Sequence, residues 1–291
     1  MACSVLYKIA IITHSALLLM ISRKHPRSKH RRKGRRSVEP TAEPVAKRFG
    51  EIVTEGVQRW EAFYRACGLE MDNGDGEWED LINHLRAPLP ISFRVRKDSQ
   101  CEPPKSIFEE VTLARNGRWI PPARQFKWCS GYQLGCDPRT AKEAYPELDA
   151  WLKQNHGGIG GGARRQEVAS MVPVSVLGIE PAHDVLDMCA APGSKTLQAL
   201  DVIEQGRGMV VANELSTRRA HILCGRVGES EGFMVINHKA QLIPKKHKFD
   251  RVICDVPCSG DGTFRKYPVK WKHWDPSLGR RLHHTQIQVA T

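Results

Sequence analysis

The chain has 291 residues, of which 41% are hydrophobic and 26% are charged, and its formal net charge is +12. This composition is typical of a soluble globular protein with a core to bury. Ten Lys and Arg and no acidic residue lie in residues 1–36, so the other 255 residues carry only +2. A uniformly basic body is therefore excluded, and any basic surface outside this segment must be local.

Residues 1–46 are predicted to form a basic, disordered tail. The run "RKHPRSKHRRKGRR" is also typical of a nuclear address or of an arm that contacts RNA. A membrane anchor is the least favoured alternative, because Lys8 and His14 interrupt the apolar segment before it. We expect no membrane association and a nuclear location, with the nucleolus included.

Residues 47–162 are predicted to form an N-terminal RNA-recognition region. Apolar residues recur at spacings of three and four between residues 45 and 85, which predicts two helices broken by "MDNGDGE". A short strand should follow in "PLPISFRVRK", and loops with short strands should fill 97–140. The segments "TAKEAYPELDAWLKQN" and "RRQEVASMVPVSVLGI" are predicted to be helices, with a glycine-rich hinge between them.

Residues 163–291 have a different hydrophobic pattern, with the four apolar runs "HDVLDMC", "GMVVANE", "GFMVINH" and "KFDRVICDV". Near-continuous apolar runs are typical of strands buried on both faces of a parallel sheet. Segments of helix length separate them, which predicts an α/β, doubly wound sheet. Ligands of such sheets bind beyond the carboxyl ends of the strands.

The segment "DMCAAPGSKT" after the first of these strands predicts a binding loop. Its small residues allow close approach of the backbone to a ligand, and Ser194 or Thr196 is expected to cap the next helix. The pattern is neither G-x-G-x-x-G nor a P-loop, which disfavours NAD and ATP. Glu214 ends the next strand, where an acid suits the two hydroxyls of a ribose.

Nine cysteines are scattered along the chain without a Cys-x-x-Cys pair, so we expect no metal site and a reducing compartment.

Read in order, "LDMCAAPGSKT", "VVANE", "VINH" and "ICDVPCSGDGT" resemble the Nop/Sun family of RNA cytosine-5 methyltransferases. The upstream segments "FYRACGL", "LRAPLPISFRV" and "RRQEVASMVP" resemble its eukaryotic tRNA-modifying branch. The resemblance implies a Rossmann-like methyltransferase sheet, S-adenosyl-L-methionine as cofactor and RNA, above all tRNA, as substrate.

The resemblance also implies roles for individual residues. Glu214 would hold the ribose hydroxyls of the cofactor, while Asp255 would lie beside both cofactor and target base. Lys239 stands where the family has an acid that accepts from the adenine amino group, and lysine has only donors. The loop around the methionine portion of the cofactor would consist of Cys189, Ala190, Ala191, Pro192, Gly193, Ser194 and Lys195.

Catalysis at carbon 5 of cytosine requires a thiolate to add at carbon 6 first. By the resemblance, Cys258 is the cysteine that helps release the product, and the attacking cysteine belongs to a later Thr-Cys-Ser strand. The chain ends at Thr291 before such a strand, so we expect an incomplete sheet whose fourth strand has an open edge. An attacking role for Cys258, as in DNA cytosine-5 methyltransferases, is the alternative. Cys189 and Cys254 are predicted to pack rather than react.

RNA is expected to contact cations near the strand of the first region and beside the Cys258 loop. The residues chosen for this role are Arg94, Arg96, Lys266 and Lys270. The sequence thus predicts a monomeric, S-adenosylmethionine-dependent RNA cytosine-5 methyltransferase with Cys258 and Asp255 as catalytic residues. A catalytically inactive RNA-binding remnant and a ribosomal RNA methyltransferase are the alternatives.

Overall fold

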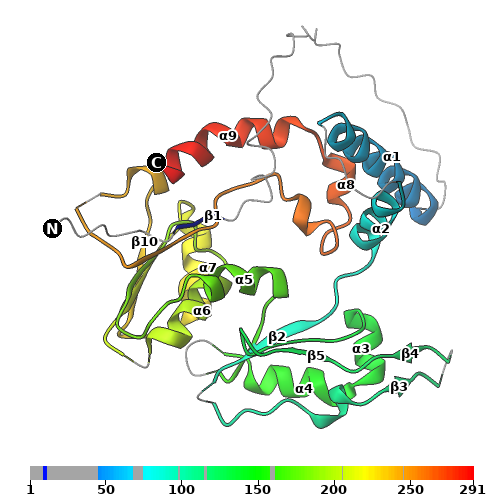
Figure 1. Cartoon of the computed structure of the whole chain (residues 1–291), viewed down its shortest axis with the longest axis horizontal. Helices are drawn as coiled ribbons and strands as arrows, with labels where there is room; N and C mark the ends of the chain where they lie inside the picture. The colour runs from blue at the N-terminus through cyan, green and yellow to red at the C-terminus, as the bar shows by residue number, and fades with distance from the viewer. Residues whose placement is uncertain are drawn as a thin grey trace, which may run out of the picture. The chain divides into compact units, whose positions relative to one another are not determined.

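The computed structural model describes residues 9–11, 45–67, 75–97, 99–114, 117–157, 161–204, 206–244 and 246–291. Its contacts divide into two compact units, which are coloured by residue number in Figure 1. The first unit holds β1 (Ile9–Ile11), residues 89–257 and residues 284–291. The second holds residues 45–88 and 258–283. The predicted domain limits at residues 46 and 162 stay a prediction.

A parallel sheet forms the centre of the first unit. Its strands are β8 (Asp184–Asp187), β9 (Met209–Asn213), β10 (Phe233–Ile236) and β11 (Arg251–Cys254), in the order β11-β8-β9-β10. Helices α6 (Ser194–Ile203) and α7 (Thr217–Val227) connect the first three strands. The fourth predicted strand lies beside the first, as expected, and the predicted α/β Rossmann-like sheet is confirmed.

The outer edge of β11 is covered, which corrects the expectation of an open edge. Strand β1 pairs with β11 in parallel, with Ile9 opposite Val252 and Ile11 opposite Cys254. The backbone of β1 therefore pairs with part of the row of N–H and C=O groups that β11 would otherwise expose to water. The rest of residues 1–44 lies outside the described residues, so the predicted tail stays a prediction.

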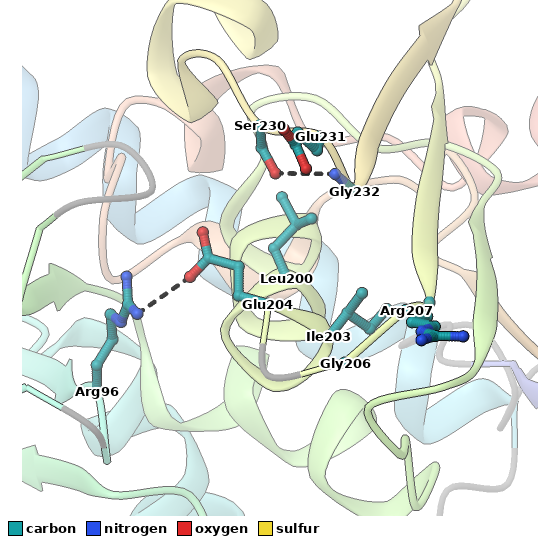
Figure 2. A pocket seen from close by; sticks show the side chains of 10 residues that line it. Arg96, Leu200, Ile203, Glu204, Gly206, Arg207, Ser230, Glu231 and Gly232 are labelled. Atoms are coloured by element: carbon teal, nitrogen blue, oxygen red, sulfur yellow. Dashed lines mark hydrogen bonds and ion pairs between the residues drawn. The ribbon is translucent and has the colours of Figure 1, made fainter.

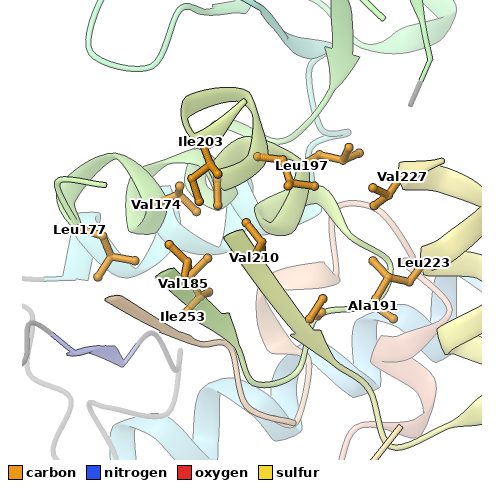
Figure 3. Packing of buried hydrophobic residues seen from close by; sticks show 14 residues of the cluster. Val174, Leu177, Val185, Ala191, Leu197, Ile203, Val210, Leu223, Val227 and Ile253 are labelled. Carbon is orange, nitrogen blue, oxygen red and sulfur yellow. The ribbon is translucent and has the colours of Figure 1, made fainter. Parts of the chain in front are cut away.

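A core of aliphatic side chains holds the parallel sheet against its helices (Figure 3). Val185, Val210 and Ile253 come from three strands and are at most 1% exposed. Leu197 of α6 and Leu223 of α7 pack on them. The same cluster includes residues from α5 (Val168–Val176) and the residue that follows it. Each such aliphatic side chain stabilises the fold by about 1.5–3 kcal/mol through burial. The packed core holds the strands in place, and with them the loops that follow the strand ends.

An antiparallel sheet of order β5-β6-β2-β7 forms the other part of the first unit. Its strands are β5 (Arg124–Phe126), β6 (Gly131–Gln133), β2 (Ser92–Val95) and β7 (Ala163–Arg165). The two-stranded sheet of β3 (Val111–Thr112) and β4 (Trp119–Ile120) and the 3-10 turn η2 (Lys105–Phe108) lie in the same stretch of chain.

Two sequence predictions for this part need correction. Arg164 and Arg165 belong to strand β7, which pairs with β2, whereas the sequence predicted a helix there. The helix predicted over 140–155 is divided at Tyr145 into α3 (Pro138–Ala144) and α4 (Pro146–Asn155). Pro146 explains this break, because its ring cannot follow a helical residue without a clash.

A buried ion cluster ties the antiparallel sheet to helix α6. Asp201 of α6 accepts hydrogen bonds from Arg94 at 2.8 Å and from Arg164 at 2.7 Å. Both arginine side chains are at most 5% exposed. Arg94 also donates to Gln166 at 2.8 Å, and burial lowers the pKa of its guanidinium. One carboxylate is thus shared by two arginines that have left water, and it offsets part of their charge.

The second unit has an aromatic core. Helices α1 (Val45–Ala66) and α2 (Asp75–Arg86) contribute Trp60 and Trp78, and α8 (Lys270–His273) contributes Trp271. Trp271 stacks on Phe264 with 3.7 Å between ring centroids. Figure 1 shows α1 beside α8 in this unit. Helix α9 (Ser277–Ala290) begins in the second unit and ends in the first, where Val289 packs with Cys254 and Val256.

Across the part of the chain that the structure describes, no helix combines the length and the apolar character that a membrane span requires.

Substituting Asp201→Asn should lower the free energy of unfolding by about 3 kcal/mol, because it leaves two buried arginines without a counter-charge. Urea denaturation of the variant measures this. The matched control is Asp149→Asn, which removes a carboxylate that pairs with Lys153 and Arg165 at the exposed surface. The control should unfold almost like the wild type, and an Asp201 variant that does the same would contradict the role of the cluster.

Candidate active site

The loop between β8 and α6 is built from small, buried residues. Ala190 and Ala191 are each 6% exposed, and Gly193 has a left-handed φ of 98° at the N-cap of α6. A Cβ on Gly193 would lie 2.7 Å from Leu223, so only glycine fits there without a shift. No side chain caps α6, which corrects the expected cap by Ser194 or Thr196. The first N–H groups of the helix are therefore left to a ligand or water.

Asp187, which sequence reasoning did not select, lies under this loop. It is 1% exposed, and its Oδ2 accepts from Thr196 Oγ1 at 2.7 Å. Its Oδ1 is buried and has no hydrogen-bond partner among the described residues. Burial raises the pKa of this carboxyl from its ordinary value of 3.8 to about 6, although the Thr196 hydroxyl opposes the shift. The sequence feature that could have identified Asp187 is an acidic residue at the end of the otherwise apolar run "HDVLDMC".

Glu214 lies at the carboxyl end of β9, as predicted. Its side chain is 5% exposed and accepts from the Ser216 backbone N–H at 2.9 Å, and Arg219 lies 3.3 Å from its other oxygen. Arg219 also donates to the Ala191 carbonyl in the first loop. The carboxylate is therefore held rigidly, and two bonds do not exhaust its lone pairs.

Asn213, also missed by sequence reasoning, joins three strand ends. Its Nδ2 donates to the Met188 carbonyl after β8 at 2.9 Å, and its Oδ1 accepts from His238 N–H after β10 at 3.1 Å. This side chain fixes the spacing between the loops that follow β8, β9 and β10.

An ion pair joins the two sequence motifs. Lys195 Nζ donates to Asp255 Oδ2 at 2.8 Å and to Ser170 Oγ at 3.2 Å. Lys195 is mostly buried, and the Asp255 side chain is 44% exposed. The carboxylate therefore presents one face to solvent while the ammonium holds the other. Asp255 is thus brought together with the loop that begins at Cys189.

The cysteines near the site fall into two kinds. Burial raises the pKa of the Cys189 thiol to about 12 and that of the Cys254 thiol to about 11, which agrees with packing roles. Cys258 is exposed and belongs to the second unit. Among the cysteines of the two motifs it is the most exposed residue, since Cys189 is partly buried and Cys254 is buried.

Lys239 is exposed at the N-cap of the turn η3 (Ala240–Leu242), three residues after the end of β10. Its backbone carbonyl accepts from His238, and its side chain offers the site a cation rather than an acceptor.

The structure contradicts one of the four predicted RNA contacts, that of Arg94. Arg94 is 4% exposed and bound to Asp201, and Arg96 is mostly buried and pairs with Glu204 at 3.1 Å. The Arg94 guanidinium therefore stabilises the first unit and is not presented to RNA, whereas a contact of Arg96 with RNA stays a prediction. Lys266 is exposed, and Lys270 is half-buried with its Nζ on Thr263 Oγ1 at 2.7 Å. Their contact with RNA stays a prediction.

A cavity of about 700 Å³ lies at the other end of the parallel strands (Figure 2). Gly208 and Gly232 line it directly before β9 and β10, and the Arg96–Glu204 ion pair forms one wall. Ligands of parallel sheets bind at the carboxyl ends of the strands, so this cavity is not the cofactor site. No three His, Cys, Asp or Glu side chains within the described ranges are placed to hold a metal ion.

The raised pKa of Asp187 makes a prediction about pH. Because the folded chain binds this proton more tightly than the unfolded chain, the contribution of Asp187 to stability falls as pH rises from about 4 to about 6. Asp187→Asn lacks this effect. The variant should therefore gain roughly 2–3 kcal/mol relative to wild type between pH 4 and pH 7, since each pH unit is about 1.4 kcal/mol. Urea denaturation at both pH values measures the difference, and a constant difference would contradict the raised pKa of the buried Asp187 carboxyl.

Comparisons with known proteins now identify the fold and the motifs. The family model described as "16S rRNA methyltransferase RsmB/F" matches residues 174–289. The multisite-specific tRNA:(cytosine-C(5))-methyltransferase of Saccharomyces cerevisiae is 34% identical over 84% of this chain. The tRNA (cytosine(34)-C(5))-methyltransferase of Drosophila melanogaster is 31% identical over 74% of it. The chain spans 39% and 34% of the lengths of these two relatives.

A solved structure shares the fold. The crystal structure of NSun6 from Pyrococcus horikoshii with SFG superposes with a TM-score of 0.50 at 18% identity, covering 75% of each chain. Both curated relatives named above are eukaryotic tRNA enzymes, the branch that the sequence predicted. The loop motifs, the matched residues and the relatives together show that the chain belongs to the RsmB/F, or Nop/Sun, family of methyltransferases.

Proposed function

We propose that the chain is an S-adenosylmethionine-dependent RNA cytosine-5 methyltransferase that acts on tRNA. The observation that carries this proposal is the ion pair of Lys195 with Asp255 at 2.8 Å. It brings the small-residue loop after β8 and the Asp-x-Pro-Cys loop after β11 together at neighbouring strand ends. The combination of the two motifs is specific for the family.

The residues present fit the cofactor. The loop from Cys189 to Lys195 leaves the N–H groups of α6 uncapped, and these attract the methionine carboxylate. Glu214 is an acceptor for two ribose hydroxyls and is already oriented by Ser216 and Arg219. When bound, the cofactor supplies an electrophilic methyl group. Asp255 lies at the strand end next to this loop, where its half-exposed carboxylate would face the cofactor and the base.

The protein's part in the reaction is nucleophilic catalysis. A cysteine thiolate adds to carbon 6 of cytosine, the electron pair moves to carbon 5, and carbon 5 takes the methyl group. A base then removes the proton on carbon 5, and the electron pair re-forms the 5,6 double bond while the sulfur leaves as thiolate. We assign the release step to Cys258, whose exposed position allows contact with the base.

The choice of tRNA rests on relatives. The yeast and fly tRNA enzymes match 84% and 74% of this chain. A ribosomal RNA substrate is the second candidate, because the matching family model is described by a 16S rRNA methyltransferase. We further propose a nuclear location and a monomer, on the basis of the basic segment 1–36 and the predicted domain organisation.

The direct test is transfer of a labelled methyl group from S-adenosylmethionine to unmodified tRNA. The account expects label on carbon 5 of cytosine in tRNA and little in a 16S rRNA fragment. Label in the rRNA fragment alone would support the second candidate. A chain that binds RNA and transfers no methyl group to either substrate would be the RNA-binding remnant and would contradict the proposal.

Replacing Glu214 with Gln should weaken binding of S-adenosylmethionine by roughly 10- to 100-fold, because one ribose hydroxyl loses a charged acceptor worth about 1.5–3 kcal/mol. Isothermal titration calorimetry measures this. Glu180→Gln is the matched control at an exposed position and should bind like wild type. Equal affinities for the two variants would exclude Glu214 from the ribose site.

Replacing Lys239 with Asp should tighten binding of S-adenosylmethionine by about tenfold, because it restores an acceptor for the adenine amino group. Lys239→Ala removes the cation without adding the acceptor and should have the smaller effect in the same titration. If the two substitutions tighten binding equally, the acceptor is not the reason.

A further inference from the structure

The carboxylate of Asp261, in the second unit, accepts hydrogen bonds from three side chains. Asp261 follows Cys258 by three residues, begins the turn η4 (Asp261–Thr263) and is 8% exposed. Its Oδ2 accepts from Tyr64 Oη at 2.7 Å and from Trp60 Nε1 at 3.1 Å. Its Oδ1 accepts from Trp274 Nε1 at 3.2 Å. A buried carboxylate is costly unless donors surround it, and here three do.

The three donors are themselves fixed by packing. Trp60 lies 4.4 Å from Tyr64 and 6.0 Å from Trp271, measured between ring centroids, and Trp274 lies 5.6 Å from Phe63. Burial and the neighbouring Asp261 carboxylate raise the pKa of the Tyr64 phenol, so it remains a donor at physiological pH. Each donor has few conformations available, and the position of Asp261 is therefore determined from several directions.

The turn beside Cys258 is held from its other end as well. Gly260 has a left-handed φ of 82°, and its carbonyl accepts from Thr263 Oγ1 at 2.6 Å. Lys270 Nζ donates to the same hydroxyl at 2.7 Å. A Cβ on Gly260 would approach Lys270 Nζ to 2.9 Å. The short segment from Cys258 to Thr263 is thus held at Asp261 by the three donors and at Thr263 by Lys270.

We propose that Asp261 is a positioning residue for the reaction at Cys258, and that helix α1 takes part in building the active loop by supplying two of its three donors. This inference rests on the proposed function. The donors from α1 lie 201 and 197 residues from Asp261 in the sequence. Helix α1 therefore stabilises the segment on which the thiol is carried, in addition to any role in RNA recognition.

A positioning role for Asp261 predicts a change in kcat without a change in the KM for S-adenosylmethionine, whereas general destabilisation of the fold would affect both. The cofactor loop belongs to the first unit and is fixed by Lys195, Asn213 and Arg219. Loosening the Asp261 anchor should therefore leave the KM for S-adenosylmethionine unchanged. It should lower kcat, because the thiol then samples orientations from which it cannot reach the base.

The test compares Asp261→Asn, Tyr64→Phe and the matched control Tyr145→Phe. Asparagine has the same shape as aspartate. Its side-chain NH2 group, however, cannot accept the hydrogen bonds that the carboxylate oxygen in its place accepted. Tyr64→Phe removes one donor and keeps the ring. The Tyr145 hydroxyl is buried and has no partner among the described residues, so its removal breaks no hydrogen bond.

Hydrogen exchange and steady-state kinetics of these variants test the positioning role of Asp261. Hydrogen exchange follows the amides of Thr263 and Phe264, which donate within η4, against the amide of Leu197 in α6. Asp261→Asn should speed exchange at the first two by about tenfold and leave the third unchanged, while kcat falls about tenfold and KM for S-adenosylmethionine stays constant. Tyr64→Phe should show the same pattern more weakly, and Tyr145→Phe should match wild type.

The proposal is overturned if Asp261→Asn loosens the loop without lowering kcat, or if exchange rises equally in α6. Wild-type turnover together with wild-type exchange in this variant would overturn it too. If the wild-type chain transfers no methyl group, the proposed function fails, and the exchange pattern alone then decides whether Asp261 anchors the Cys258 loop.

Discussion

The salt bridge between Lys195 and Asp255 joins two neighbouring strand ends, and the account of the site depends on it. Lys195 is in the first turn of α6, and Asp255 follows β11. In parallel sheets the carboxyl ends of adjacent strands meet at one edge, so two loops distant in sequence can share a ligand. The ion pair fixes the distance between them and keeps one face of Asp255 open. Without the ion pair, the loops after β8 and β11 would lie at adjacent strand ends but would not be held together as a single site.

Around this pair, polar side chains connect the remaining strand ends. Asn213 links the loops after β8 and β10, and Arg219 links Glu214 to the Ala191 carbonyl. These contacts hold the binding groups in fixed positions relative to one another, which lowers the ordering cost of binding. The aliphatic core beneath them provides the rigidity. The aromatic core of the second unit serves the Cys258 segment in the same way.

The sequence predicted the parallel sheet and its loops well, because fully buried strands have continuous apolar runs and each loop has a distinctive motif. It was wrong about Arg94, since an arginine in a short strand indicates an exposed face. The partner that buries it, Asp201, lies 107 residues away and belongs to a helix. The anchor of Asp261 was invisible for the same reason. Contacts between distant polar residues leave no periodic pattern in a single sequence.

The central claim is that the loops after β8 and β11 bind S-adenosylmethionine jointly. A double-mutant cycle of Lys195→Ala and Asp255→Ala, followed by calorimetric titration with S-adenosylmethionine, tests it most directly. The account predicts measurable binding by the wild type and a coupling of about 1 kcal/mol or more between the two substitutions. Additive effects would show that the loops act separately. No uptake by the wild type at millimolar concentrations would contradict the account as a whole.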